Sequence, residues 1–195
     1  SIFVSSLAVN LYTATNIVVL GMLTNNVIVG YYSAADKLIT CVRRGIYAVS
    51  DAIYPFISKM MKDDISKGLQ FIKKQIFLYL VVGLIGCTSL FFFSDTIVKL
   101  LFGADYNLTV DVLRILSFVP LAVAISTVFG EETMLPLNMN SVYSRTLVLG
   151  AFFSLISIFP LCYLWGAKGV AMTMLLTEFL IMIIMGGLLR KQLFQ

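Results

Sequence analysis

Six long stretches of predominantly apolar residues run through this chain of 195 residues, and they constrain the fold more than any other feature. Each is close to the roughly 20 residues that an α-helix needs to cross a hydrocarbon core about 30 Å thick. The stretches predict an all-α, polytopic membrane protein that forms a bundle of six transmembrane helices. Their expected limits are residues 2–23, 29–57, 76–93, 110–129, 142–165 and 170–189.

The composition agrees with a membrane protein and excludes several other classes. Hydrophobic residues make up 59% of the chain and charged residues only 12%, whereas about 25% of the residues in ordinary soluble domains are charged. This balance argues against a water-soluble enzyme, a disordered chain and a nucleic-acid-binding module. Short connections between the apolar stretches predict that residues 1–195 pack as a single lobe.

The sequence offers no catalytic, cofactor or metal site. Histidine is absent, and the three cysteines lie far apart at Cys41, Cys87 and Cys162. Metal, haem and His-based acid–base sites need side chains that this chain does not supply. No phosphate-binding loop of the G-x-x-x-x-G-K-[ST] type occurs. We therefore expect neither an enzyme nor an ATPase, and no cofactor.

Lysine and arginine gather on one side of the expected bundle. Five lysines fall in residues 59–74, Arg145 follows the fourth stretch, and Arg190 and Lys191 lie near the end of the chain. With six crossings these places share one face, and the positive-inside rule assigns that face to the cytoplasm. The C-terminus is then cytoplasmic. Residues 59–74 form a basic cytoplasmic loop, either solvated or folded as a short amphipathic helix on the bilayer surface.

The topology and the first residues together suggest an origin in a longer protein. Six crossings that begin and end in the cytoplasm suit one half of a twelve-helix transporter. The chain has no initiator methionine and starts within a hydrophobic stretch. We interpret it as the C-terminal portion of a transporter, paired with an N-terminal lobe.

The second stretch carries the most informative charges. At about 100° per residue of a helix, its charged residues fall within an arc of about 120°. Arg43 and Arg44 lie near its middle, where each would cost about 2.5–3.5 kcal/mol if it faced lipid. They must therefore face an aqueous cavity or an anionic partner. The charged residues are Asp36, Lys37, Arg43, Arg44 and Asp51.

Two interpretations of these charges stay open. In the functional one, Lys37, Arg43 and Arg44 form the cationic wall of a cavity that receives a phosphorylated or otherwise anionic substrate, because guanidinium groups suit phosphate oxygens. In the structural one, the arginines pair between helices, for instance with Glu178. A helix lying on the membrane surface is the weakest alternative.

Other polar residues extend the candidate site. Asn10 and Asn16 lie on a polar face of the first stretch, so the first two helices are expected to share a wet surface. Glu178 lies near the middle of the sixth stretch, and intramembrane carboxylates are functional candidates by default. Glu178, Asp36 and Asp51 are therefore candidates for coupling to H⁺ or Na⁺, and Glu178 also for pairing with Arg43 or Arg44.

Several local motifs lie along the chain in a defined order and spacing. They are VGYYSAADKL at 29–38, Tyr54-Pro55 with Ser58, LFGADY at 101–106, VLRILS at 112–117, LPLNM at 135–139 and GAKGVA at 166–171. Together these motifs resemble bacterial polysaccharide-unit flippases, the Wzx-type O-antigen exporters of the multidrug/oligosaccharidyl-lipid/polysaccharide exporter superfamily. The resemblance covers nearly the whole chain.

The resemblance implies a twelve- to fourteen-helix protein of the bacterial inner membrane, built from two six-helix lobes around a cavity. It implies that alternating access, without ATP, moves an undecaprenyl-diphosphate-linked oligosaccharide from the inner to the outer leaflet. Basic cavity residues of such flippases receive the diphosphate, and Lys37, Arg43 and Arg44 match that role here. Membrane lipids and the other lobe are then the expected partners.

Three alternatives remain at this level. A cation-coupled multidrug exporter of the same superfamily would favour an acidic cavity, and the paired arginines argue against it. A structural membrane subunit would not need arginines in the middle of a span. A membrane-bound polymerase or acyltransferase would need an acid–base set, and the absence of histidine weakens it.

Overall fold

Eight helical elements account for nearly the whole chain in a computed structural model. The structure describes the backbone of residues 2–103 and 105–194, and the side chains of Val9 and of residues 13–103 and 105–190. The elements are α1 (Ile2–Leu23), α2 (Asn26–Asp63), α3 (Ile65–Phe102), α4 (Asn107–Leu116), α5 (Val119–Phe129), the π-helical η1 (Gly130–Met134), α6 (Asn140–Trp165) and α7 (Ala167–Phe194).

The all-α, polytopic membrane fold is confirmed. Four helical runs among the described residues are long and apolar enough to cross a membrane: 65–102, 107–134, 140–165 and 167–190. The described apolar part of α1 is shorter, covering Thr13–Leu23, and α2 carries the cluster of charges. Each of the six expected stretches nevertheless coincides with a helix or with a continuous helical run.

The fourth stretch differs from the single helix that the sequence predicts. It is broken at Ser117 and Phe118 into α4 and α5, and η1 extends α5 by five residues. The hydroxyl of Ser117 donates to the carbonyl of Arg114 at 2.7 Å. Pro120 stands in the first turn of α5, where its missing N–H removes no helical hydrogen bond.

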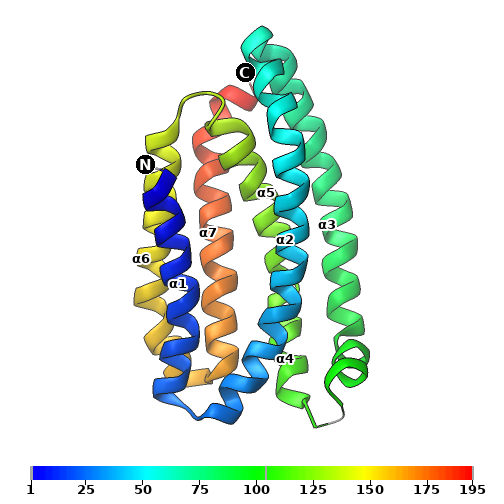
Figure 1. The fold of residues 1–195 in the computed structure, drawn as a ribbon, viewed down its shortest axis with the longest axis vertical. Coiled ribbons are helices and arrows are strands. Elements are labelled where there is room, and N and C mark those ends of the chain that lie inside the picture. The colour runs from blue at the N-terminus through cyan, green and yellow to red at the C-terminus, as the bar shows by residue number, and fades with distance from the viewer. Residues whose placement is uncertain (1, 104, 195) are drawn as a thin grey trace.

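The basic segment 59–74 is neither a loop nor a separate short helix. It forms the touching ends of α2 and α3, each 38 residues long, which turn at Asp64. A helix of that length measures about 57 Å, well beyond the bilayer core. The carboxylate of Asp64 accepts from the backbone N–H groups of Ser66 and Lys67 at 3.0 and 3.3 Å, so it caps α3. This hairpin projects beyond the bundle (Figure 1).

The helices form two groups that meet along α7 and α5. Helix α6 packs on α1 and α7, while α2 and α3 pack on α4 and α5. The C-terminus, the α2–α3 hairpin and the connection into α6 lie at one end of the bundle, as the topology predicted from the sequence requires (Figure 1). The turns from α1 to α2 and from α6 to α7 lie at the other end.

Two apolar clusters occupy the two ends of the bundle, and polar side chains separate them. On α2, the first cluster holds Tyr32 and Ile39, and the second begins at Ile57. On α7, the first ends at Met174 and the second begins at Ile181. The intervening turns contribute Arg43 and Ser50 from α2 and Glu178 from α7, all buried. Polar side chains therefore interrupt the apolar core between α2 and α7, while a third apolar cluster, formed by Cys87, Leu121 and Ile125, packs α3 against α5.

Candidate functional site

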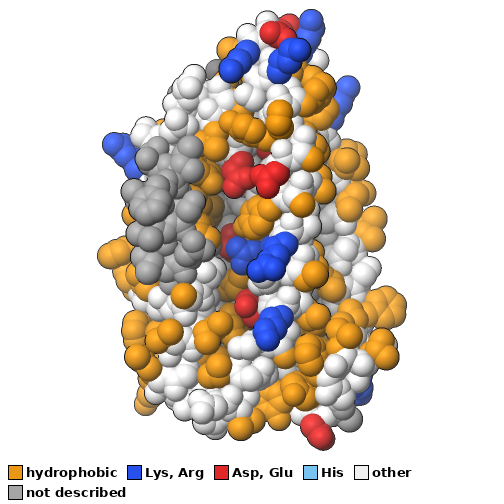
Figure 2. Space-filling view, viewed as in Figure 1, with side chains coloured by type: hydrophobic (Ala, Val, Ile, Leu, Met, Phe, Trp, Pro, Cys, Tyr) orange, Lys and Arg blue, Asp and Glu red, His pale blue; other side chains and the backbone are white. Residues whose placement is uncertain are grey.

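A polar cavity of about 660 Å³ opens between α1, α2 and α7. Helix α1 leans toward α6 and makes few contacts with α2, so a hollow remains between them. Figure 2 shows basic and acidic side chains gathered along this hollow. The lining residues are Val9, Thr13, Ala14, Asn16, Ile17, Asp36, Thr40, Arg43, Arg44, Tyr47 and Met174.

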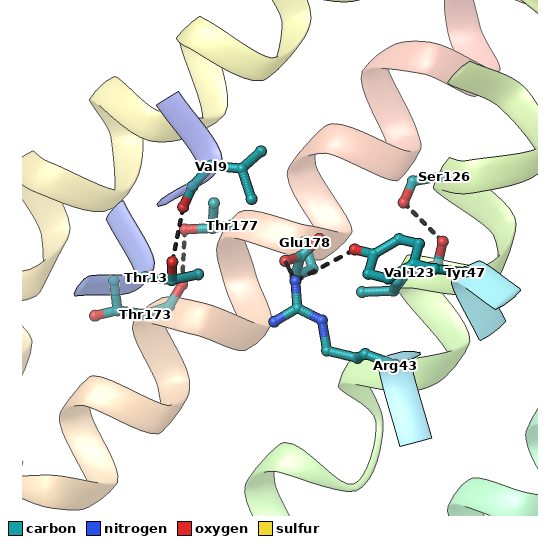
Figure 3. Close-up of polar contacts among 9 residues, drawn as sticks. All are labelled: Val9, Thr13, Arg43, Tyr47, Val123, Ser126, Thr173, Thr177 and Glu178. Atoms are coloured by element: carbon teal, nitrogen blue, oxygen red, sulfur yellow. Dashed lines mark hydrogen bonds and ion pairs between the residues drawn. The ribbon is translucent and has the colours of Figure 1, made fainter. Parts of the chain in front are cut away.

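The two arginines have different environments. Arg43 is buried, and its Nη2 lies 3.3 Å from Oε1 of Glu178 on α7. The same nitrogen lies 3.5 Å from the hydroxyl oxygen of Tyr47, one turn further along α2. Figure 3 shows Arg43 reaching from α2 toward Glu178, with Tyr47 beside the pair. Arg43 therefore forms the pair between helices, with Glu178, that the structural interpretation of the sequence expected.

Arg44 is exposed and lines the cavity, and none of the ion pairs among the described residues includes it. Its guanidinium is accessible to an anion in the cavity. Lys37 is exposed on α2, seven residues earlier, which is a rise of about 10 Å. It lines a separate cavity of about 420 Å³ together with the rings of Tyr31, Phe102 and Tyr106.

The remaining sequence candidates divide between the cavity and its surroundings. Asn16 is buried and Asp36 is half-buried, and both line the cavity. Asp51 is exposed on α2, outside the lining, and interacts electrostatically with Glu131 of η1. The side chain of Asn10 lies outside the described residues.

The sequence analysis missed two acidic residues in η1. Glu131 and Glu132 lie beyond the expected end of the fourth stretch at residue 129, where a connection was predicted. The π-helical turn instead keeps them inside the bundle. Glu132 is fully buried and accepts from Nε2 of Gln75 at 2.5 Å, and the hydroxyl of Tyr143 donates to Glu131 at 3.4 Å. The sequence did contain one indication that these acids are buried, because apolar residues flank the Glu-Glu pair on both sides.

The charges around the cavity balance. Arg43 and Arg44 face Asp36 and Glu178 within one part of the bundle. Because Glu178 is paired with Arg43, the exposed charge in the cavity lining is the guanidinium of Arg44, while the half-buried Asp36 interacts electrostatically with Arg43. Such a site can attract an anionic group while keeping a low net charge in the membrane.

The fold and the site define a polytopic α-helical membrane protein with a charged cavity halfway across its bundle. Comparison with known proteins shows what the chain is similar to. The family described as polysaccharide biosynthesis protein matches residues 1–61. A protein of Escherichia coli (strain K12) whose name assigns it as an O-antigen transporter is 31% identical over 180 residues, covering 92% of this chain and 43% of that protein.

A second relative, from Shigella dysenteriae and named in the same way, is 28% identical over 183 residues and covers 94% of this chain and 46% of its own length. Over nearly its whole length the chain is therefore similar to proteins named as O-antigen transporters. It spans less than half the length of the curated relatives that it matches. No solved structure matches it.

Proposed function

We propose that the complete protein is a flippase that carries an undecaprenyl-diphosphate-linked oligosaccharide from the inner to the outer leaflet of the bacterial inner membrane. In it, residues 1–195 form one lobe, and a second lobe closes the open side of the polar cavity. Binding that differs between inward- and outward-facing states moves the substrate, without a catalytic step.

The main observation in support of this function is that the guanidinium of Arg44, on α2, is accessible in the cavity between α1, α2 and α7. An unpaired arginine within a span is costly unless it meets an anion or water. A diphosphate supplies oxygen acceptors that match the guanidinium fork. Lys37, one heptad away on the same helix, extends the cationic path toward the opposite end of the bundle.

The distribution of exposed charge supports the proposed orientation. At the end opposite the hairpin, Lys99 pairs with Asp95 at 2.8 Å and Lys168 pairs with Asp111 at 2.7 Å. The hairpin end instead presents exposed lysines, including Lys59, Lys62 and Lys74. The positive-inside rule then places the hairpin and the C-terminus in the cytoplasm.

Complementation tests the function. The full-length gene is expressed in a strain that lacks its O-unit flippase, and surface polysaccharide is measured at matched membrane abundance. We expect the wild type to restore polysaccharide and the double variant Lys37→Ala/Arg44→Ala to fail. The control Lys59→Ala/Lys62→Ala removes the same number of charges from the hairpin and is expected to restore it.

Two results would count against this function. Restoration by Lys37→Ala/Arg44→Ala would remove the anion-binding role from both cations. Failure of the wild type, together with resistance of the same cells to cationic drugs, would favour the multidrug exporter.

A further inference from the structure

A second polar cluster lies outside the cavity, where η1 packs against α2 and α3. It consists of Glu132, Ser50 and Gln75, whose exposed fractions are 0%, 1% and 6%. They come from three different elements, yet they meet at one carboxyl group. Neither the cavity nor the proposed route of the substrate uses them.

The hydrogen bonds of this cluster are incomplete. Oε2 of Glu132 accepts from Nε2 of Gln75 at 2.5 Å. Within the part of the chain that the structure describes, Oε1 of Glu132, Oγ of Ser50 and Oε1 of Gln75 are buried and have no hydrogen-bond partner. The side chain of Ser50 lies beside the Glu132 carboxyl. Buried polar atoms normally have partners, so these atoms require an explanation.

Within the described part of the chain, no cation forms an ion pair with the carboxyl of Glu132. The charged and titratable groups that face it or its neighbour are Glu131 on η1, Asp51 and Tyr47 on α2, Tyr79 on α3 and Tyr143 on α6. Two of these are acids, so an ionised Glu132 would meet repulsion as well as desolvation.

We propose that Glu132 is a proton-binding site and that its carboxyl carries a proton in this conformation. An ionised carboxylate buried without a counter-charge is so unfavourable that such groups bind a proton instead. The proton forms an O–H bond at Oε1 and converts the carboxylate to the neutral acid.

The π-helical turn explains how the carboxyl reaches this position. The backbone N–H of Leu135 donates to the carbonyl of Gly130 at 3.1 Å, five residues back. Isolated π turns frequently occur at functional sites. Release of the proton requires access to water, which here means separation of η1 from α2 or α3. A proton on Glu132 therefore favours the packed arrangement of these three elements, and its loss favours opening.

Infrared spectroscopy on the purified full-length protein tests the site directly. At about pH 7 we expect the C=O stretching band of a protonated side-chain carboxylic acid in the wild type and its loss in Glu132→Gln. Glutamine keeps the size of the side chain and removes the proton. Glu131→Gln, at the adjacent position in the same turn, is the matched control and is expected to retain the band.

Persistence of the band in Glu132→Gln, its absence from the wild type, or its loss in Glu131→Gln instead would overturn the assignment. Thermal stability provides a second measurement that does not depend on transport. The melting temperature of the wild type is expected to fall as the pH rises above about 4.3, where a glutamate in the unfolded chain loses its proton while the buried acid keeps it. That of Glu132→Gln is expected to vary less. Stabilisation of the wild type by NaCl over choline chloride, absent from Glu132→Gln, would show a Na⁺ site and contradict the proton.

Discussion

Arg43 of α2 and Glu178 of α7 form a buried ion pair across the middle of the bundle, with Nη2 and Oε1 3.3 Å apart. Helices α2 and α7 make few contacts with each other along their length. The pair thus connects the two groups of helices at the point where the apolar core is interrupted. Arg43 is 8% exposed and Glu178 is 4% exposed, so water screens the attraction between their charges only weakly.

Removal of one partner should destabilise the protein more than removal of both. Glu178→Gln alone leaves a buried guanidinium without its counter-charge, which costs about 3–5 kcal/mol. The double variant Arg43→Gln/Glu178→Gln leaves no charge and should recover most of that loss. The three proteins can be ranked by stability from the fraction of full-length protein that remains monomeric after heating in detergent. Additive losses in the double variant would contradict a direct pair.

Arg44→Ala should separate function from stability. The side chain is exposed and forms no ion pair among the described residues, so its loss should change the free energy of unfolding by no more than about 0.5 kcal/mol. Transport should nevertheless fall, whereas Arg43→Ala should lower both. A melting temperature that drops as far in Arg44→Ala as in Arg43→Ala would show that Arg44 is structural too.

The turn between α6 and α7 should not tolerate a side chain at Gly169. A Cβ there would overlap the carbonyl oxygen of Leu161, so the two helices would have to separate. Overpacking of this kind costs about 1–3 kcal/mol or more. Gly187→Ala, further along α7, is the matched control because no atom lies within 4 Å of the added Cβ. Equal folded yields for the two variants would contradict this close approach.

The α2–α3 hairpin should respond to pH through Asp64. Hydrogen bonds from the backbone N–H groups of Lys67 and Ser66 lower the pKa of this carboxyl. Its cap is therefore complete above the unfolded pKa of about 3.9 and is lost as the pH falls through the lower folded value.

Hydrogen exchange of the amides near residue 66 measures the cap. Exchange should be slow at neutral pH in the wild type and faster in Asp64→Ala, with Asp64→Asn between them. The amides near Gly187 in the same samples provide the control. Equal protection of the hairpin in all three proteins at neutral pH would show that the cap contributes nothing.

The sequence predicted the helices and the charged face of α2 because both depend on local periodicity. Asp36, Thr40, Arg43, Arg44 and Tyr47 line one cavity, as their angular positions on a helix require. The same periodicity did not separate Arg43 from Arg44, since the difference depends on where α7 places Glu178. Partner choice between helices is a tertiary property.

Glu132 shows a different limit. A hydrophobic stretch that stops at Phe129, followed by two acids and Pro136, is typical of a helix end. The chain instead continues through a π turn, and Gln75 of α3 provides a donor for the carboxyl. Gln75 lies 57 positions from Glu132 in the sequence. The residues around Glu132 therefore do not reveal that a donor for its buried carboxyl is present.

Binding of undecaprenyl diphosphate to the full-length protein in nanodiscs tests the central claim most directly. A charge-assisted contact is worth about 1.5–3 kcal/mol, so the dissociation constant for Arg44→Ala should rise by roughly 10- to 150-fold. Lys62→Ala, which removes an exposed hairpin charge, should bind like the wild type. Equal dissociation constants for Arg44→Ala and the wild type would contradict the assignment of the cavity as the diphosphate site.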